Sequence, residues 1–370
     1  MRRKIALLFL IFSCLFLRFP VHAAEPEVSA YAAVLYEPLT GTVLYAKNAE
    51  EPLPMASTTK IMTALLAFES GLQSEPVRIT EEMTRVEGSS MGLMPGDVLQ
   101  LRELAEGMMM TSGNDSANAI ALFLDDTLDD FSGRMNARAD VIGMKNTSFV
   151  TPSGLDAEGH SSTAHDMALL AAEAMRCSDF AETVGKSFQT VEFIEPQKSL
   201  RCNNHNKLLE LYDDCTGIKT GFTKKSGRCL VSSAERNGVS LICVTLNAPD
   251  DWNDHIALFE YGFSCFETVS FESKTVSVPV VGGTEFAAVC KTNEPDALLL
   301  PQGALVETEV YLPRFLYAPV RKGETVGSVC YSVNDKVIFS LPLFADSDVE
   351  YAAKEERGFI KWAEQLFCRK

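Results

Sequence analysis

Apolar and polar residues follow two different periodicities in the first two thirds of the chain. The segments in which apolar residues recur every three or four positions are expected to be helices: 61–68, 102–110, 115–124, 163–175 and 252–262. The short apolar or alternating runs bounded by turn residues are expected to be strands: 32–36, 41–45, 77–80, 98–99, 216–221, 228–234 and 239–246. This order predicts an α+β domain over residues 25–266, with helices lying on an antiparallel sheet.

The pattern changes from residue 267. Short runs rich in β-branched residues follow one another and are separated by turns such as Gly282-Gly283 and Lys322-Gly323-Glu324. The sequence therefore predicts a small all-β domain over 267–345.

One strand register follows from the dipeptide Asn237-Gly238, which favours a two-residue hairpin turn. That turn places Arg236 opposite Val239 and Ser232 opposite Cys243. Cys229 is then out of register with Cys243, so a disulfide between these two cysteines is not expected.

The two ends of the chain carry patterns of their own. Residues 1–24 combine a basic start with a short apolar run and a small-residue cleavage site, which predicts a secretory signal peptide; an uncleaved anchor is the alternative. After a polar linker from 346, one face of 359–370 is apolar and much of the rest is charged. This predicts a helix lying at a membrane surface, and a helix packed on its own protein is the alternative.

Charge and cysteine content exclude some functions. The formal net charge is −17, which argues against a nucleic-acid partner because such binding requires a basic patch. The ten cysteines form no CxxC pair, so we do not expect a zinc site. We expect no other metal and no cofactor either. Cys14 lies in the signal peptide, and the nine others leave at least one thiol without an intramolecular partner.

The first candidate for chemistry is Ser57-Thr58-Thr59-Lys60, at the start of the helix expected at 61–68. The spacing puts Ser57 and Lys60 on one helix face, and an amine beside a hydroxyl can activate a serine nucleophile. Lys60 can act as the base near pH 7 only if its pKa falls by roughly 3 units. Burial, a helix N-terminus and a second cation would each lower it.

A second cation is available in Lys219-Thr220-Gly221, on a predicted strand. Lys219 and Gly221 share one face of that strand, and the glycine lets a ligand approach the backbone. The similar tripeptide that begins at Lys225 lies in the following turn and is set aside.

Ser112-Gly113-Asn114 interrupts two predicted helices. Its hydroxyl can relay a proton to a leaving group, and its amide can hold both a substrate carbonyl and Lys60. Other Ser-x-Asn tripeptides lie inside a helix or in the β domain, so only this one is at an irregular junction.

Together these motifs, in this order, resemble those of the serine D-alanyl-D-alanine carboxypeptidases, the low-molecular-mass penicillin-binding proteins. The resemblance covers nearly the whole chain after the signal peptide. Its most specific stretches are 55–60, 111–115, 159–164, 204–209 and 214–230.

That resemblance implies a β-lactamase-like catalytic domain and an enzyme that removes the terminal D-alanine from peptidoglycan pentapeptides. Ser57 would attack, Lys60 would accept its proton, and Ser112 would pass a proton to the departing D-alanine. The substrate would be bound by the following residues: Asn114, Lys219, Thr220, Gly221 and Phe222. The N–H groups of Ser57 and Phe222 would form the oxyanion hole. β-Lactam antibiotics would acylate Ser57, and the protein would be exported and held at the outer face of the cytoplasmic membrane.

Two other functions remain as alternatives: a β-lactamase, for which Asp156 or Glu158 would supply a carboxylate base, and a catalytically silent protein that binds penicillin or the cell wall. The chain also departs from the family. Segment 248–255 lacks the arginine that some members use to hold the substrate carboxylate, and His205 stands where arginine is frequent. The four histidines after the signal peptide have no metal-ligand spacing and are expected to be structural or at the surface.

Overall fold

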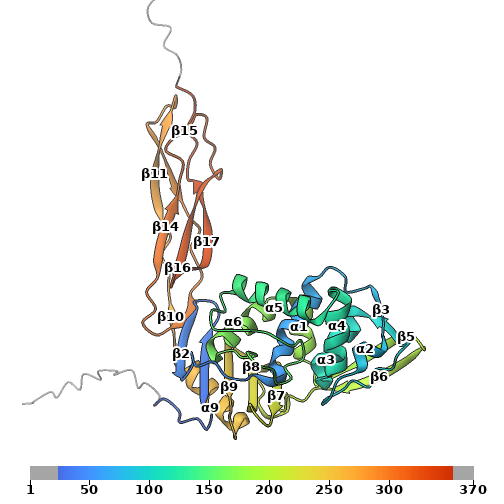
Figure 1. The fold of residues 1–370 in the computed structure, drawn as a ribbon. Helices are drawn as coiled ribbons and strands as arrows, with labels where there is room; N and C mark the ends of the chain where they lie inside the picture. Colours follow the sequence, from blue (N-terminus) through green and yellow to red (C-terminus); the bar gives the residue numbers. More distant parts are fainter. Residues whose placement is uncertain (1–23, 353–370) are drawn as a thin grey trace, which may run out of the picture.

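The computed structural model describes residues 24–352. The signal peptide expected at 1–24 and the helix expected at 359–370 therefore lie wholly or almost wholly outside the described residues. Figure 1 shows a mixed helix-and-strand domain with a narrow β domain standing on it. Up to residue 264 the elements are β1 (Ala32–Glu37), β2 (Thr42–Lys47), η1 (Ala56–Thr59), α1 (Lys60–Glu69), β3 (Pro76–Arg78), α2 (Glu81–Thr84), β4 (Val98–Gln100), α3 (Leu101–Thr111), α4 (Asn114–Leu124), α5 (Leu128–Ile142), α6 (Ala164–Met175), α7 (Ser178–Val184), β5 (Phe188–Glu195), β6 (Lys198–Asn203), α8 (Leu208–Leu211), β7 (Cys215–Thr223), β8 (Gly227–Arg236), β9 (Val239–Leu246) and α9 (Asp251–Ser264).

The centre of this domain is a five-stranded antiparallel sheet of order β2-β1-β9-β8-β7. The chain's first strand thus pairs with β9, more than 200 residues later in the sequence. The predicted hairpin register is confirmed, because Arg236 faces Val239 and Ser232 faces Cys243. β7 is an edge strand, which leaves one side of Lys219-Thr220-Gly221 free of a strand partner.

Both faces of the sheet are buried, which explains why its strands are nearly continuous apolar runs. On one face Val34, Val231 and Val244 pack in a core with the helices α1, α3, α4 and α6. On the other face Leu35, Leu230 and Leu241 pack against Phe259 of α9. The site described below lies at the β7 edge of the first face.

Several elements were not predicted. The clearest is α5, whose buried residues Phe131, Met135 and Ala139 recur every four positions among polar ones. Thr127 caps it by accepting a hydrogen bond from Asp130 N, 3.1 Å away. The hairpin of β5 and β6 was also missed, because most of its side chains are exposed and its apolar positions are few.

The β domain follows α9. Its strands are β10 (Phe266–Val269), β11 (Thr275–Val281), β12 (Ala287–Lys291), β13 (Leu298–Pro301), β14 (Glu307–Tyr311), β15 (Leu316–Tyr317), β16 (Thr325–Val333) and β17 (Lys336–Ala345). Six of them form one sheet of order β14-β16-β17-β12-β11-β15, and β10 pairs with β13. The fold is therefore a mixed α+β domain followed by an all-β domain.

The expected start of the linker at 346 needs correction. Val349 is 1% exposed and belongs to the core of the β domain. Backbone bridges join it to Val320 and join Tyr351 to Gly283. The chain therefore stays packed on the β domain to the end of the described residues.

The two domains touch through the turn between β16 and β17. Lys336 Nζ donates a hydrogen bond to the Tyr36 hydroxyl at 2.7 Å, and Asn334 Nδ2 donates one to Thr40 O at 3.3 Å. Phe266 and Leu299 pack against the core that includes α9. These contacts fix the lower end of the β domain to β1 and its turn.

Between residues 24 and 352, no helix has the length and apolar character needed to cross a bilayer. Over the same residues, all eight cysteines are free thiols, so Cys229 and Cys243 form no disulfide.

Candidate active site

Ser57 and Lys60 lie at the junction of the short 3-10 helix η1 with α1. Lys60 Nζ is 3.0 Å from Ser57 Oγ, 2.7 Å from Asn114 Oδ1 and 2.6 Å from Ser153 O. The lysine is completely buried, whereas Ser57 is half-buried. A neutral lysine amine has two hydrogens and one lone pair. The two carbonyl oxygens accept the hydrogens, which leaves the lone pair for the Ser57 hydroxyl proton.

The Ser153 carbonyl was not among the residues expected from the sequence. It lies in the loop 151–155, which Thr63 Oγ1 also holds by donating to Pro152 O at 2.6 Å. Gly154 is needed here because its φ is +84° and a Cβ would lie 1.9 Å from Ala56 O. A backbone carbonyl leaves no side-chain signature, and the only sequence signal was the glycine itself.

Ser112, Gly113 and Asn114 form the break between α3 and α4, as predicted. Ser112 is buried and adopts a left-handed conformation with φ +59°. This reversal of direction lets α4 begin at Asn114, whose Nδ2 donates to Glu87 O at 2.7 Å. Both the oxygen and the nitrogen of the Asn114 side-chain amide are therefore hydrogen-bonded. No hydrogen bond joins the Ser112 hydroxyl to another of the described side chains or backbone groups.

Asp115 holds the loop that covers this break, and it too was missed by the sequence analysis. Its buried carboxylate accepts hydrogen bonds from Ser90 Oγ at 2.6 Å and from Met91 N at 2.9 Å. It also accepts from the N–H groups of Gly92 at 3.0 Å and Leu93 at 3.1 Å. These four hydrogen bonds fix the loop 88–93 beside Asn114.

The strand β7 brings Lys219, Thr220, Gly221 and Phe222 to the site. A Cβ on Gly221 would lie 3.1 Å from Ser57 N, so the strand passes directly against the serine. Lys219 is buried and donates to Thr220 O at 3.0 Å. Thr220 is half-buried, and Phe222 is 65% exposed. The rejected tripeptide beginning at Lys225 lies in the β7–β8 turn, as expected.

The two buried lysines influence each other. Burial lowers the pKa of Lys60 well below its ordinary value, and the charge of Lys219 lowers it further, while the negative charge of Asp115 opposes both effects. Burial lowers the pKa of Lys219 to about 7. The predicted cause of a neutral Lys60 therefore includes the second cation, although burial is the larger effect.

Segment 248–255 contains no arginine, but it binds one. Arg228 of β8 lies opposite Phe222 and diagonal to Thr220, which pairs with Leu230. Its Nε and Nη2 atoms donate to Asp251 Oδ1 at 3.1 and 2.6 Å. The Asp251 side chain is 3% exposed and that of Arg228 is 41% exposed. The carboxylate that holds the guanidinium is therefore buried, whereas the arginine side chain remains partly accessible.

Three of the four histidines have structural partners. His160 accepts a hydrogen bond from Val150 N at 2.9 Å and contacts Thr59 Oγ1, also at 2.9 Å. His255 is buried between the hydroxyls of Ser232 and Thr245, and His165 pairs with Glu50. His205 lines a pocket of about 370 Å³. Burial and then the charge of Lys219 lower the pKa of His205. No cluster of metal-ligating side chains is present from residue 24 to residue 352.

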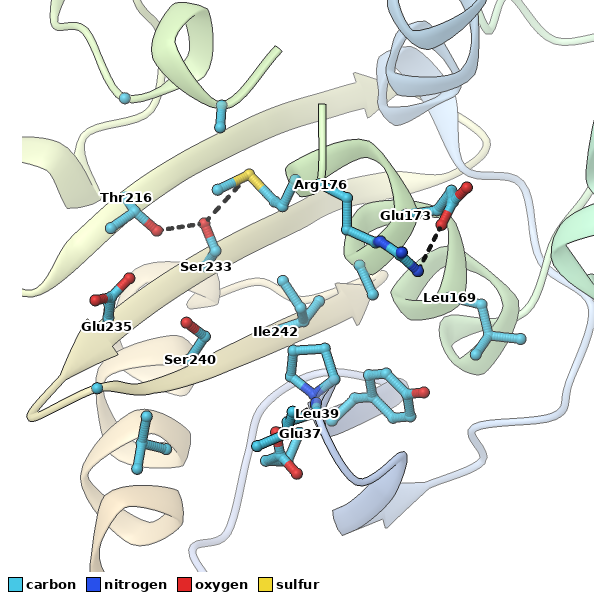
Figure 2. A pocket seen from close by; sticks show the side chains of 18 of the residues that line it. Glu37, Leu39, Leu169, Glu173, Arg176, Thr216, Ser233, Glu235, Ser240 and Ile242 are labelled. Carbon is cyan, nitrogen blue, oxygen red and sulfur yellow. Dashed lines mark hydrogen bonds and ion pairs between the residues drawn. The ribbon is translucent and has the colours of Figure 1, made fainter. Parts of the chain in front are cut away.

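A groove of about 1320 Å³ lies away from this site. Figure 2 shows Thr216, Ser233 and Ile242 of the sheet facing Leu169 of α6 and Arg176, which follows α6, across it. Thr216 and Ser233 are hydrogen-bonded at 2.7 Å, and Arg176 pairs with Glu173. None of the candidate catalytic residues lines the groove.

Comparison with known proteins gave consistent matches. The family model described as D-alanyl-D-alanine carboxypeptidase matches residues 20–250, and that described as penicillin-binding protein 5, C-terminal domain, matches residues 266–351. The chain is 33% identical over 351 residues to D-alanyl-D-alanine carboxypeptidase DacF of Bacillus subtilis, covering 91% of this chain and 89% of that protein. It is also 33% identical over 360 residues to DacC of Escherichia coli, with 90% and 86% covered.

Solved structures agree with these matches. The crystal structure of penicillin-binding protein 5 from Haemophilus influenzae superimposes with a TM-score of 0.65 at 28% identity, covering 89% of this chain and 99% of that one. The D-alanyl-D-alanine carboxypeptidase DacD of Francisella tularensis gives a TM-score of 0.63 at 26% identity, with 89% and 95% covered.

Proposed function

We infer the roles of the site residues from a firm premise: the chain belongs to the D-alanyl-D-alanine carboxypeptidase family. It is a serine D-Ala-D-Ala carboxypeptidase that removes the terminal D-alanine from peptidoglycan stem peptides and binds penicillin. The residue roles below are our proposal.

Ser57 is the nucleophile and Lys60 its base. One observation carries this assignment: Lys60 Nζ is 3.0 Å from Ser57 Oγ while Asn114 Oδ1 and Ser153 O accept its hydrogens. The proton passes from Ser57 to Lys60 as Oγ attacks the carbonyl between the two D-alanines. The N–H groups of Ser57 and Phe222 stabilise the oxyanion that forms.

Collapse of this intermediate breaks the peptide bond and leaves an ester on Ser57. The departing D-alanine takes up a proton through Ser112, at the buried turn beside Asn114. Asn114 also orients the substrate amide. Water then attacks the ester, the proton path reverses, and the shortened peptide leaves with Ser57 restored.

The terminal carboxylate of the substrate is held by Lys219 and Thr220, with Gly221 allowing the peptide to approach β7. We add Arg228 to this group. It shares a sheet face with Thr220 and lies diagonal to it, and it provides the guanidinium that segment 248–255 lacks.

The β-lactamase alternative is not favoured by the surroundings of the serine. Asp156 Oδ1 instead accepts a hydrogen bond from Thr223 Oγ1 at 3.1 Å, and Glu158 is exposed. Among the residues described, no carboxylate is hydrogen-bonded to Ser57 or Lys60.

For location, the family's cell-wall substrate is consistent with an exported protein. We propose that residues 1–24 direct export. We further propose that 359–370 form an amphipathic helix at the outer face of the cytoplasmic membrane. The basis for both is the pattern of apolar and basic residues in the sequence.

The test of the catalytic assignment uses the chain from residue 25 onward. Diacetyl-Lys-D-Ala-D-Ala should release D-alanine, and labelled penicillin should leave a long-lived adduct. Both should vanish in Ser57→Ala, because the Ser57 hydroxyl is the one to which Lys60 is hydrogen-bonded.

Two results would contradict this picture. Rapid turnover of penicillin with no lasting adduct would support a β-lactamase. Absence of both D-alanine release and adduct in the unchanged chain would support the silent binding protein.

A further inference from the structure

A set of exposed apolar side chains gathers at the end of the β domain that lies away from the catalytic domain. We call it the aromatic tip, and it comprises Val281, Phe286, Phe315, Tyr317 and Tyr351. Phe286 is 96% exposed, Tyr317 70% and Tyr351 65%. Figure 1 shows β11 and β15 at this end, opposite the end that meets the catalytic domain.

Hydrogen bonds hold these residues together. Val281 pairs with Tyr317 where β11 and β15 run parallel, and Tyr351 pairs with Gly283 in the adjoining turn. Phe286 O accepts a hydrogen bond from Val280 N at 2.9 Å. The rings of Phe315 and Tyr317 meet edge to face with centroids 5.2 Å apart. The tip is therefore a preformed surface rather than a set of loose side chains.

Such exposure needs a physical reason. Burying one Phe side chain is worth about 1.5–3 kcal/mol, and clustered exposed apolar groups mark interaction sites. The cluster is mostly aromatic, and Tyr is enriched where one end of a side chain is apolar and the other meets water. Aromatic side chains concentrate in this way at the boundary between lipid and water.

The course of the chain favours the same partner. Ala352 N donates to Gly282 O at 2.9 Å, so residues 353–370 begin beside the tip. Those residues include the segment whose sequence pattern predicts a helix at a membrane surface. A bilayer that binds that segment would therefore lie next to the aromatic tip.

The charges decide the kind of lipid contact. Glu285 adjoins Phe286, and Glu350 adjoins Tyr351 and pairs with Arg321. The whole chain carries a formal net charge of −17. Arg314 adjoins Phe315, so charges of both signs flank the tip and form no basic patch. We therefore take the contact to be mainly apolar.

We propose that the aromatic tip inserts into the interface of a lipid bilayer and forms a second membrane contact beside the C-terminal segment. This contact places the β domain upright, with its other end and the active site away from the lipid. The inference rests on the proposed membrane location, but it involves different residues.

The experiment measures cosedimentation with phosphatidylcholine vesicles. Two proteins are compared, the chain 25–370 and a shorter chain ending at Ala352. The cut follows Ala352 because removal from 348 onward would take Val349 out of the core. We expect the shorter chain to bind weakly, and Phe286→Ser with Tyr317→Ser to reduce its bound fraction at least about fivefold.

Leu305→Ser and Val141→Ser are the matched controls. These side chains are 83% and 77% exposed but lie outside the tip, so the bound fraction should not change. Added salt or phosphatidylglycerol should not strengthen binding, because the contact is apolar. Unchanged unfolding midpoints show that the variants are folded.

Four outcomes would overturn the proposal. The first two are that the shorter chain does not bind the vesicles, or that the control variants lose as much of the bound fraction as the tip variants. The third is that the chain binds only anionic vesicles and is released by salt. The fourth is that ultracentrifugation shows a dimer that the tip variants abolish. D-alanine release is measured on every variant. The rate of D-alanine release should stay unchanged in all of them. A failure of the catalytic assignment would therefore be distinguished from a failure of the membrane proposal.

Discussion

At the scale of single residues, the site depends on two lysines buried in one place. Each loses its hydration, and the charge of one opposes the charge of the other. Burial and the charge of Lys219 both favour the neutral form of Lys60. This agrees with the proposed roles, in which Lys60 is the base and Lys219 binds the substrate carboxylate.

The first prediction concerns pH. Lys219 has a pKa of about 7 in the folded protein, so its ammonium is lost as the pH rises above that value. We expect kcat/KM for a D-Ala-D-Ala peptide to fall above about pH 7, by roughly tenfold per pH unit. A bound substrate carboxylate favours the ammonium, so the fall in kcat should occur at higher pH.

Protein stability gives an independent check. Between about pH 7 and the unfolded pKa of about 10.4, the unfolded chain binds a proton that folded Lys219 lacks. The free energy of unfolding should therefore rise with pH across this window. Lys219→Met should remove that part of the slope, and a flat kcat/KM from pH 6 to 9 would contradict the assignment.

The second prediction concerns Arg228. Arg228→Ala should raise KM about tenfold with a smaller change in kcat, because a charged hydrogen bond to the substrate carboxylate is lost. Lys224→Ala is the control, since that cation lies exposed in the adjacent turn. With a substrate whose carboxylate is converted to an amide, the difference between Arg228→Ala and the unchanged enzyme should disappear.

Loss of Arg228 also leaves Asp251 buried without its partner. Arg228→Lys, which keeps the charge but loses the planar fork, and the double variant with Asp251→Ala separate folding from binding. If the double variant is folded and binds the carboxylate substrate normally, Arg228 has no role in binding.

The sequence predicted the side chains of this site well and its backbone poorly. Ser57, Lys60 and Asn114 are joined by hydrogen bonds as expected. The Ser153 carbonyl could not be foreseen, because any residue supplies one. Asp115 was overlooked because its role appears only when the loop 88–93 is folded over it.

At the scale of elements, the position of η1 depends on the loop that passes behind it. The loop 151–155 and η1 approach so closely at Gly154 that no side chain fits. The glycine thus lets the loop contact η1 through backbone atoms, next to Ser57, the proposed nucleophile.

The third prediction follows from that contact. Gly154→Ala should cost more than about 2 kcal/mol of stability and slow acylation by penicillin, because the strain of a left-handed alanine adds to a collision with Ala56 O. Thermal unfolding and the rate of adduct formation measure the two effects.

Gly159→Ala is the matched control. Gly159 has a φ of +79°, but a Cβ would meet nothing within 4 Å. It should therefore lose only about 1 kcal/mol and acylate normally. Equal acylation rates in the two variants would mean that the close approach does not position Ser57.

Elements were predictable where their pattern was strong. The central strands and α1, α3, α4, α6 and α9 have long apolar runs or a clear stripe. The hairpin of β5 and β6 has neither, since Val191 and Phe193 are its only buried apolar residues on the first strand. Its position is decided by pairing with β4, which is a tertiary effect.

At the scale of the whole molecule, the two domains differ in what they require of their surroundings. The catalytic domain buries both faces of its sheet and presents its site at the β7 edge. The β domain instead ends in exposed aromatic side chains. The sequence predicted both domains from their patterns, but the tip needed the structure, because its residues come from four separate segments.

The pairing of β1 with β9 has a consequence for how the protein forms. Strand β1 cannot take its central place until residues 239–246 have been synthesised. Closing so long a loop is entropically costly, and chains dominated by distant contacts fold slowly. In a nascent chain, β1 therefore lacks its β9 partner until most of the catalytic domain has been made. That delay would suit the export that we propose, in which the chain passes through a channel before it folds.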